Sequence, residues 1–232
     1  MNQNRLDSAL TKLTEHLVLM SGYVEEAVTA STLAWRERDA KLVEKVHKIE
    51  VQVNEIHKQI DSECLKLFPI APMAKELRFV LSAVKINTDL ERMVDQAVNI
   101  ADTAGYYLRF PVLPHQNELC EMADDVEFMV REAIESFIKG DTLLATNVLR
   151  CDDKVDNLKN KIFRDIINHI TLNPHDAEQG LNVILIARNL ERIGDHATNI
   201  AEDVIFTVSG EDIRHTGKKE FLKKGEQHED HQ

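Results

Sequence analysis

Apolar residues recur at steps of three and four residues along nearly the whole chain, which is the period of an α-helix with one buried face. The pattern breaks at helix-ending or helix-starting residues, as at Pro69, Gly140 and Pro174. Between the breaks it predicts six long helices, at about residues 4–35, 39–68, 74–107, 115–139, 141–171 and 176–208. The chain is therefore expected to be all-α.

The same pattern occurs twice, about one hundred residues apart. The matched segments are Leu90-Glu91-Arg92 with Leu190-Glu191-Arg192, and Asn99-Ile100-Ala101 with Asn199-Ile200-Ala201. The helix expected at 39–68 also matches the helix at 141–171, at an offset of 102. Because each copy of a repeated unit must bury the same apolar face, three helices repeat as three helices. We therefore predict two pseudo-symmetric antiparallel three-helix bundles that arose by internal duplication.

The duplication also predicts the domain organisation. Pro111 and Pro114 separate the two halves, and the helical pattern fades after residue 208. We expect a first three-helix repeat over residues 1–110 and a second over 111–217. The remaining segment, 218–232, is expected to be a charged, flexible tail.

Composition narrows the class of protein. Only 8 glycines and 5 prolines occur in 232 residues, and 5% of the residues are aromatic, which favours long helices over strands and turns. The formal net charge of −12 comes from 40 acidic and 28 basic residues. Such a chain is repelled by nucleic acids and anionic lipids, so we expect no nucleic-acid partner and membrane contact only through partner proteins.

The expected location is the cytoplasm. The N-terminus has no apolar run of the signal-peptide type, and no segment of about 20 apolar residues can span a bilayer. The three cysteines are odd in number and lack CxxC spacing, which favours reduced thiols.

Acidic residues are repeated together with the apolar ones. An ExxxD spacing places two carboxylates one helical turn apart on the same side of a helix. Helical wheels put these acids away from the apolar stripe, so they face outward, and the preceding helix of each repeat carries a similar pair at the edge of its buried face. The eight candidate residues are Glu50, Asn54, Glu91, Asp95, Asp152, Asp156, Glu191 and Asp195.

Acids from neighbouring helices would face one another across a shallow groove and repel unless a cation neutralised them. Oxygen ligands of this kind suit hard ions such as Mg²⁺, Ca²⁺, Mn²⁺ or ferric iron. Asn54 stands where the repeat predicts an acid, so the N-terminal site should be weaker or hold fewer ions. Alternatively, Arg92 and Arg192 could satisfy part of this charge as surface ion pairs.

Evidence for catalysis is missing from the sequence. His196 has Gln96 at the equivalent position, which favours a surface histidine over a repeated ligand. We find no Gly-rich phosphate loop, GxSxG elbow, HExxH motif or supported Cys–His arrangement. The sequence therefore points away from an enzyme, and we predict no catalytic residues.

The segment from Leu190 to Glu202, LERIGDHATNIAE, resembles the PhoU family of accessory regulators of phosphate transport. Supporting matches over about residues 5–217 are Glu76-Leu77-Arg78, Leu90-Glu91-Arg92 with Asp95, Asp152-Asp153-Lys154-Val155-Asp156 and Gly210-Glu211-Asp212-Ile213-Arg214-His215. The resemblance implies two three-helix bundles that assemble as dimers or larger oligomers. It also implies metal clusters on E(D)xxxD motifs, iron first, with Mg, Mn, Ca or Zn as alternatives. Carried over, the motifs are Glu91/Asp95, Glu191/Asp195 and Asp152/Asp156.

The resemblance further implies a regulatory role. Such proteins restrain the high-affinity phosphate ABC transporter and keep the phosphate-starvation two-component system off when phosphate is plentiful. The implied partners are the ATPase subunit of the transporter and the phosphate-sensing histidine kinase. Two other hypotheses stay open: a metal-dependent enzyme of the phosphoesterase type, and a metal-free helical scaffold.

Overall fold

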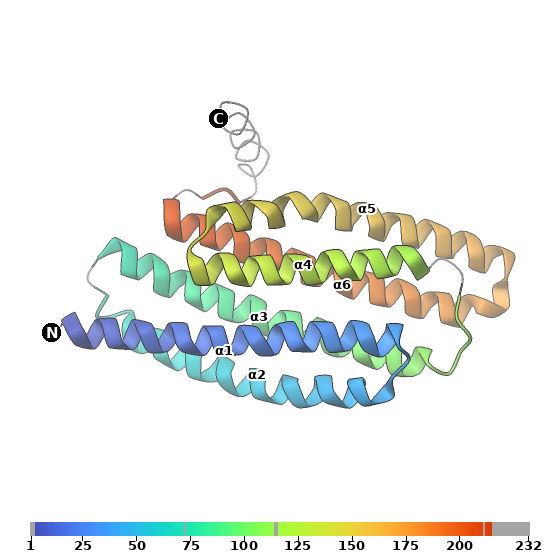
Figure 1. Ribbon diagram of the computed structural model, residues 1–232, viewed down its shortest axis with the longest axis horizontal. Coiled ribbons are helices and arrows are strands. Elements are labelled where there is room, and N and C mark those ends of the chain that lie inside the picture. Colours follow the sequence, from blue (N-terminus) through green and yellow to red (C-terminus); the bar gives the residue numbers. More distant parts are fainter. Residues whose placement is uncertain (1–2, 72, 114–115, 211, 215–232) are drawn as a thin grey trace, which may run out of the picture.

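The computed structural model describes residues 3–71, 73–113, 116–210 and 212–214 (Figure 1). Its elements are α1 (Gln3–Arg36), α2 (Ala40–Leu67), α3 (Ala74–Tyr107), α4 (Gln116–Lys139), α5 (Thr142–Leu172), the short 3₁₀ helix η1 (Pro174–Asp176) and α6 (Ala177–Ser209). No strand occurs in these ranges. The all-α prediction is confirmed, and the helix ends lie close to the expected positions.

The six helices form two three-helix bundles, α1–α3 and α4–α6 (Figure 1). The most extensive helix contact joins α3 to α6, so these two helices form the centre of the molecule. By contrast, among the elements that the structure describes, α2 contacts only α1 and α3, and α5 contacts α4, α6 and η1. The expected two-bundle architecture is confirmed. The exact repeat bounds, 1–110 and 111–217, stay a prediction, and the tail at 218–232 lies outside the described residues, as do Pro72 and Pro114.

The same turn starts the second helix of each bundle. Asp39 caps α2 by accepting a hydrogen bond from the backbone N–H of Lys41, and Asp141 caps α5 by accepting from Leu143 and Leu144. The residue before each cap has a left-handed backbone, with φ 57° at Arg38 and 63° at Gly140. The duplication therefore extends to backbone conformation, although only one copy uses the glycine that this conformation favours.

The burial of α3 and α6 repeats as well. Every residue from Leu90 to Ala101 has the same class of solvent exposure as its equivalent from Leu190 to Ala201. Immediately before this block the repeat breaks, because Asp89 is buried whereas Asn189 is only half-buried. Among the described helices, none combines the length and apolar character that crossing a membrane requires.

Candidate cation-binding clusters

The four acids predicted in the second repeat do come together. We call Asp152 and Asp156 of α5 with Glu191 and Asp195 of α6 the C-terminal cluster. Burial, followed by the negative charges of Glu191, Asp152 and Asp156, raises the pKa of Asp195 from 3.8 to about 6. Thr198 also donates a 3.3 Å hydrogen bond to Asp152 across the α5–α6 contact. The ExxxD spacing and the wheel placement thus located a real concentration of negative charge.

A lysine that the sequence analysis overlooked lies within this cluster. Lys159 Nζ is 2.8 Å from Glu191 Oε1 and 3.4 Å from Asp156 Oδ1. Its hydrogen bond to Glu191 raises the pKa of Lys159, so the ammonium stays charged. The signal was in the sequence, because Asp152, Asp156 and Lys159 share one face of α5 at i, i+4 and i+7. Lys159, rather than the arginine that we considered, pairs with the cluster.

The equivalent residues of the first repeat form the N-terminal cluster: Glu50 and Asn54 of α2 with Glu91 and Asp95 of α3. Burial and then Asp95 raise the pKa of Glu91, whereas the nearby His57, Arg92 and His196 lower it. Glu50 Oε2 lies 3.8 Å from His47 Nδ1. In the described part of the chain, no hydrogen bond or ion pair links Glu50 or Asn54 to Glu91 or Asp95. In the C-terminal cluster, by contrast, Lys159 bridges Asp156 of α5 and Glu191 of α6.

His57 is the N-terminal equivalent of Lys159, and the sequence analysis missed it too. Its Nδ1 lies 3.3 Å from the backbone oxygen of Asn87, and its Nε2 lies 3.5 Å from Asp61 Oδ2. The Asn87 side chain completes the arrangement by donating a 2.9 Å hydrogen bond to Asp61 Oδ1. The first repeat thus has an imidazole where the second has an ammonium.

All eight candidate residues are half-buried or exposed, as the helical wheels predicted. Among the residues that the structure describes, however, no three His, Cys, Asp or Glu side chains already converge as the ligands of one metal ion. The donor set still suits cations. Carboxylates are available at each helix pair, α2–α3 and α5–α6, and an imidazole lies at or close to each pair. The metal role of these residues stays a prediction.

A third polar cluster joins the two bundles and corrects our interpretation of His196. His196 Nδ1 of α6 lies 2.8 Å from Asp89 Oδ1 of α3, and Asn199 donates a 3.2 Å hydrogen bond to the same oxygen. The His196 side chain is only 15% exposed. It is therefore an inter-bundle contact rather than a surface histidine. The available signal was the break of the repeat at Asp89 and Asn189.

A cavity of about 320 Å³ lies next to this cluster, between α3 and α6. It is lined by Val84, Lys85, Thr88, Asp89, Arg92, Asn199, Glu202, Asp203 and Arg214. Asp203 is almost fully buried; Lys85 Nζ lies 2.9 Å from its carboxylate and Arg214 Nη1 lies 3.8 Å away. Burial raises the pKa of Asp203, and the two cations oppose this shift. Acids and bases are balanced here, so the cavity does not favour ions of one sign.

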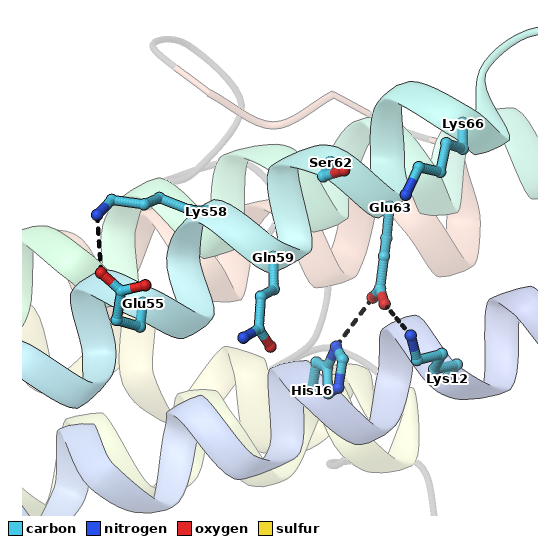
Figure 2. A pocket seen from close by; sticks show the side chains of 8 residues that line it. All are labelled: Lys12, His16, Glu55, Lys58, Gln59, Ser62, Glu63 and Lys66. Atoms are coloured by element: carbon cyan, nitrogen blue, oxygen red, sulfur yellow. Dashed lines mark hydrogen bonds and ion pairs between the residues drawn. The ribbon is translucent and has the colours of Figure 1, made fainter.

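A second cavity of about 320 Å³ lies between α1 and α2. Figure 2 shows Glu63 of α2 reaching toward α1, where it meets Lys12 at 2.8 Å and His16 at 3.0 Å. Lys58 is paired with Glu55 at 2.8 Å in the same cavity. Neighbouring acids thus neutralise much of this basic surface, and none of the eight candidate residues lies in it.

Comparisons with known proteins agree on one family. The model of the PhoU domain matches residues 17–104 and 119–204, which is one match in each bundle. A phosphate-specific transport system accessory protein PhoU homolog of Pseudomonas putida is 35% identical over 217 residues, covering 93% of this chain and 85% of that protein. The homolog of Aquifex aeolicus is 33% identical, covering 93% of this chain and 98% of that protein.

Solved structures lead to the same family. The crystal structure of PhoU from Pseudomonas aeruginosa has a TM-score of 0.86 and 34% identity, and the match covers 88% of this chain and 99% of that one. The phosphate transport system regulatory protein PhoU from Streptococcus pneumoniae shares the fold, with a TM-score of 0.82 at 24% identity.

Proposed function

The chain belongs to the PhoU family, and we propose on this premise that it is a cytoplasmic negative regulator of phosphate uptake and of the phosphate-starvation response. The observation that carries the proposal is the match of the PhoU domain to both bundles, together with relatives that align along nearly the whole chain. Those relatives are named as accessory proteins of phosphate transport, which favours a regulator over a phosphoesterase.

In this proposal the protein acts through contacts with the ATPase subunit of the phosphate ABC transporter and with the sensor histidine kinase. It also associates with a second copy of itself. Exposed apolar side chains at equivalent positions of the two repeats support protein contacts: Leu65 and Ile167 are 71% and 52% exposed, and Leu81 and Leu181 are 40% and 54% exposed.

We further propose that metal cations, iron first, bind at the acidic clusters. The raised pKa of Asp195 supports this part. Burial is the main cause of that shift and the charges of Glu191, Asp152 and Asp156 add to it, so a bound cation would relieve the repulsion among the four carboxylates. Asp152, Asp156, Glu191 and Asp195 would hold the ion in the C-terminal cluster, and Glu50, Asn54, Glu91 and Asp95 in the N-terminal one.

Gene deletion tests the regulatory role. In phosphate-rich medium, we expect a deletion strain to take up more phosphate and to express phosphate-starvation genes, and a plasmid copy to restore both to normal. Unchanged uptake and unchanged expression in the deletion strain would contradict the proposal. A plasmid copy carrying Asp152→Asn with Asp195→Asn then tests whether regulation needs the metal. If this copy restores phosphate uptake and gene expression to normal, the metal is dispensable.

A further inference from the structure

A third cavity, of about 370 Å³, lies between α1 and α3, with one residue of α6 in its wall. Most of the wall is formed by Leu10, Thr11, Thr14, Phe79 and Thr207. The three threonine hydroxyls are already engaged, because each donates a hydrogen bond to a backbone oxygen of its own helix. The threonines therefore add methyl groups to the leucine and the phenylalanine. We call this largely apolar site the α1–α3 cavity.

The charged groups of the α1–α3 cavity favour a basic occupant. Glu76 lines the cavity, its Oε2 atom is buried, and within the described part of the chain no group donates a hydrogen bond to that atom. A buried carboxylate oxygen without a donor is unfavourable, and an ammonium group is a strong partner for it. Asp7 is an exposed acid one turn before Leu10 and Thr11, on the same face of α1. Against these two acids the lining contributes Lys75.

The sequence beyond the described residues contains a segment with matching chemistry. Phe221 and Leu222 are the only apolar residues in 215–232, and lysines flank them on both sides in the sequence Lys218-Lys219-Glu220-Phe221-Leu222-Lys223-Lys224. Four lysines and one glutamate give residues 218–224 a net charge of +3, whereas the whole chain has −12. The apolar pair matches the cavity wall, and the lysines complement the acids at the cavity.

The segment begins close to the α1–α3 cavity. Arg214, the last residue that the structure describes, lies with Nη1 3.8 Å from Asp203 Oδ1 and with its guanidinium 5.9 Å from the centre of the Phe206 ring. Thr207 of the cavity wall follows Phe206 directly and lies one turn after Asp203. Six residues separate Arg214 from Phe221. Since an extended chain advances about 3.3–3.6 Å per residue, they can span about 20 Å.

We propose that Phe221 and Leu222 dock in the α1–α3 cavity of the same chain, with the flanking lysines paired to Glu76 and Asp7. The docked segment contacts both bundles, because the wall includes residues of α1, α3 and α6. It is an internal cover of this face, which a partner protein must displace before it can bind there. The inference depends neither on the regulatory role nor on the metal binding proposed above.

Limited trypsin digestion of the full chain, followed by mass spectrometry, tests the docking. Trypsin cuts after lysine, and it reaches the lysines of 218–224 only while the segment is undocked. We expect the double variant Phe221→Ser with Leu222→Ser to be cut within 218–224 about tenfold faster, or more, than the unmodified chain. Thr11→Lys fills the cavity and repels the lysines without changing the sequence that is cut, so it should also accelerate cleavage about tenfold.

Thr103→Lys is the matched control. Thr103 is exposed on α3, donates a hydrogen bond to the backbone four residues earlier, as Thr11 does, and does not line the cavity. We expect it to be cut at the rate of the unmodified chain, and circular dichroism melting checks that each variant is folded.

Three outcomes would overturn the proposal. Equal cleavage rates in all four proteins would show that the segment does not dock. Faster cleavage of the Phe221→Ser, Leu222→Ser variant without an effect of Thr11→Lys would exclude the α1–α3 cavity as the docking site. Protection that increases with protein concentration would show that the segment binds a second copy rather than its own chain.

Discussion

At the scale of single residues, the C-terminal cluster concentrates more negative charge than Lys159 neutralises. Asp195 shows the consequence, because burial and three neighbouring carboxylates raise its pKa to about 6. The native state therefore holds the proton of Asp195 more tightly than the unfolded chain does. It follows that the contribution of Asp195 to stability declines as the pH rises from about 4 to about 6.

Replacing this carboxylate should remove that decline. For metal-free protein at pH 7, we expect Asp195→Asn to be more stable by about 1 kcal/mol. The partial burial that raises the pKa of Asp195 leaves its side chain accessible to solvent, and solvent screening reduces the full effect. In a chain of this size, this is a rise of about 2–4 °C in Tm. At pH 4 the two proteins should melt together.

Thermal melts at both pH values provide the measurement. Asp153→Asn, at an exposed acid next to Asp152, is the control and should change Tm less at pH 7. An Asp195→Asn protein with the same advantage at pH 4 as at pH 7 would contradict the link to ionisation.

At the scale of the helices, α5 packs tightly against α6 at Gly180. A Cβ atom at this position would lie 2.7 Å from Ile170 Cγ2 and 3.0 Å from Ile166 Cγ2. By contrast, a Cβ atom at Gly22, on the exposed side of α1, would have no neighbour within 4 Å. Two helical glycines thus have opposite surroundings, and the sequence pattern does not distinguish them.

This contrast predicts opposite effects of the same substitution. We expect Gly180→Ala to destabilise the protein by about 1–2 kcal/mol, because branched isoleucine side chains must move. Gly22→Ala should stabilise it by about 0.5–1 kcal/mol, because alanine has the higher helix propensity. Urea unfolding followed by circular dichroism measures both. A gain in the free energy of unfolding of Gly180→Ala would contradict this expectation, because α5 and α6 would then have moved apart for the methyl group without cost.

At the scale of the whole molecule, buried polar groups connect the two bundles. Lys85 of α3 pairs with Asp203 of α6 at 2.9 Å, and Thr207 donates a 2.7 Å hydrogen bond to Ser82 nearby. At the other end of the α3–α6 contact, the positions equivalent to Lys85 and Asp203 are Leu185 and Thr103. The ion pair of Lys85 with Asp203 is therefore not repeated at the equivalent positions of the other end.

Breaking this pair should weaken the joint between the bundles. We expect Lys85→Leu to cost about 2 kcal/mol at pH 7, less than a fully buried pair would, because Arg214 remains near Asp203. The double variant Lys85→Leu with Asp203→Thr copies the other end and should recover most of the loss, since no unpaired charge remains buried.

Denaturant unfolding of both single variants and the double variant measures the coupling as a double-mutant cycle. If the double variant loses as much free energy of unfolding as the two single variants lose together, Lys85 and Asp203 act independently.

Local order in this protein follows directly from its sequence. The helical period, the capping aspartates and the prolines define all six helices, because each of these signals acts over a few neighbouring residues. Exact repetition of Glu91/Asp95 in Glu191/Asp195 also locates the acidic faces, since a helix turns through a fixed angle per residue.

Only the tertiary structure decides which side chains meet. Lys159 reaches Glu191 across 32 residues of sequence, His196 reaches Asp89 across 107, and Lys85 reaches Asp203 across 118. The sequence alone determined the duplicated helices and the sides on which their acids lie. Packing of α5 on α6 decided that one acidic cluster has its own lysine, and packing of α3 on α6 decided that His196 joins the bundles. Such contacts depend on the relative positions of the helices in space rather than on residue spacing along either helix.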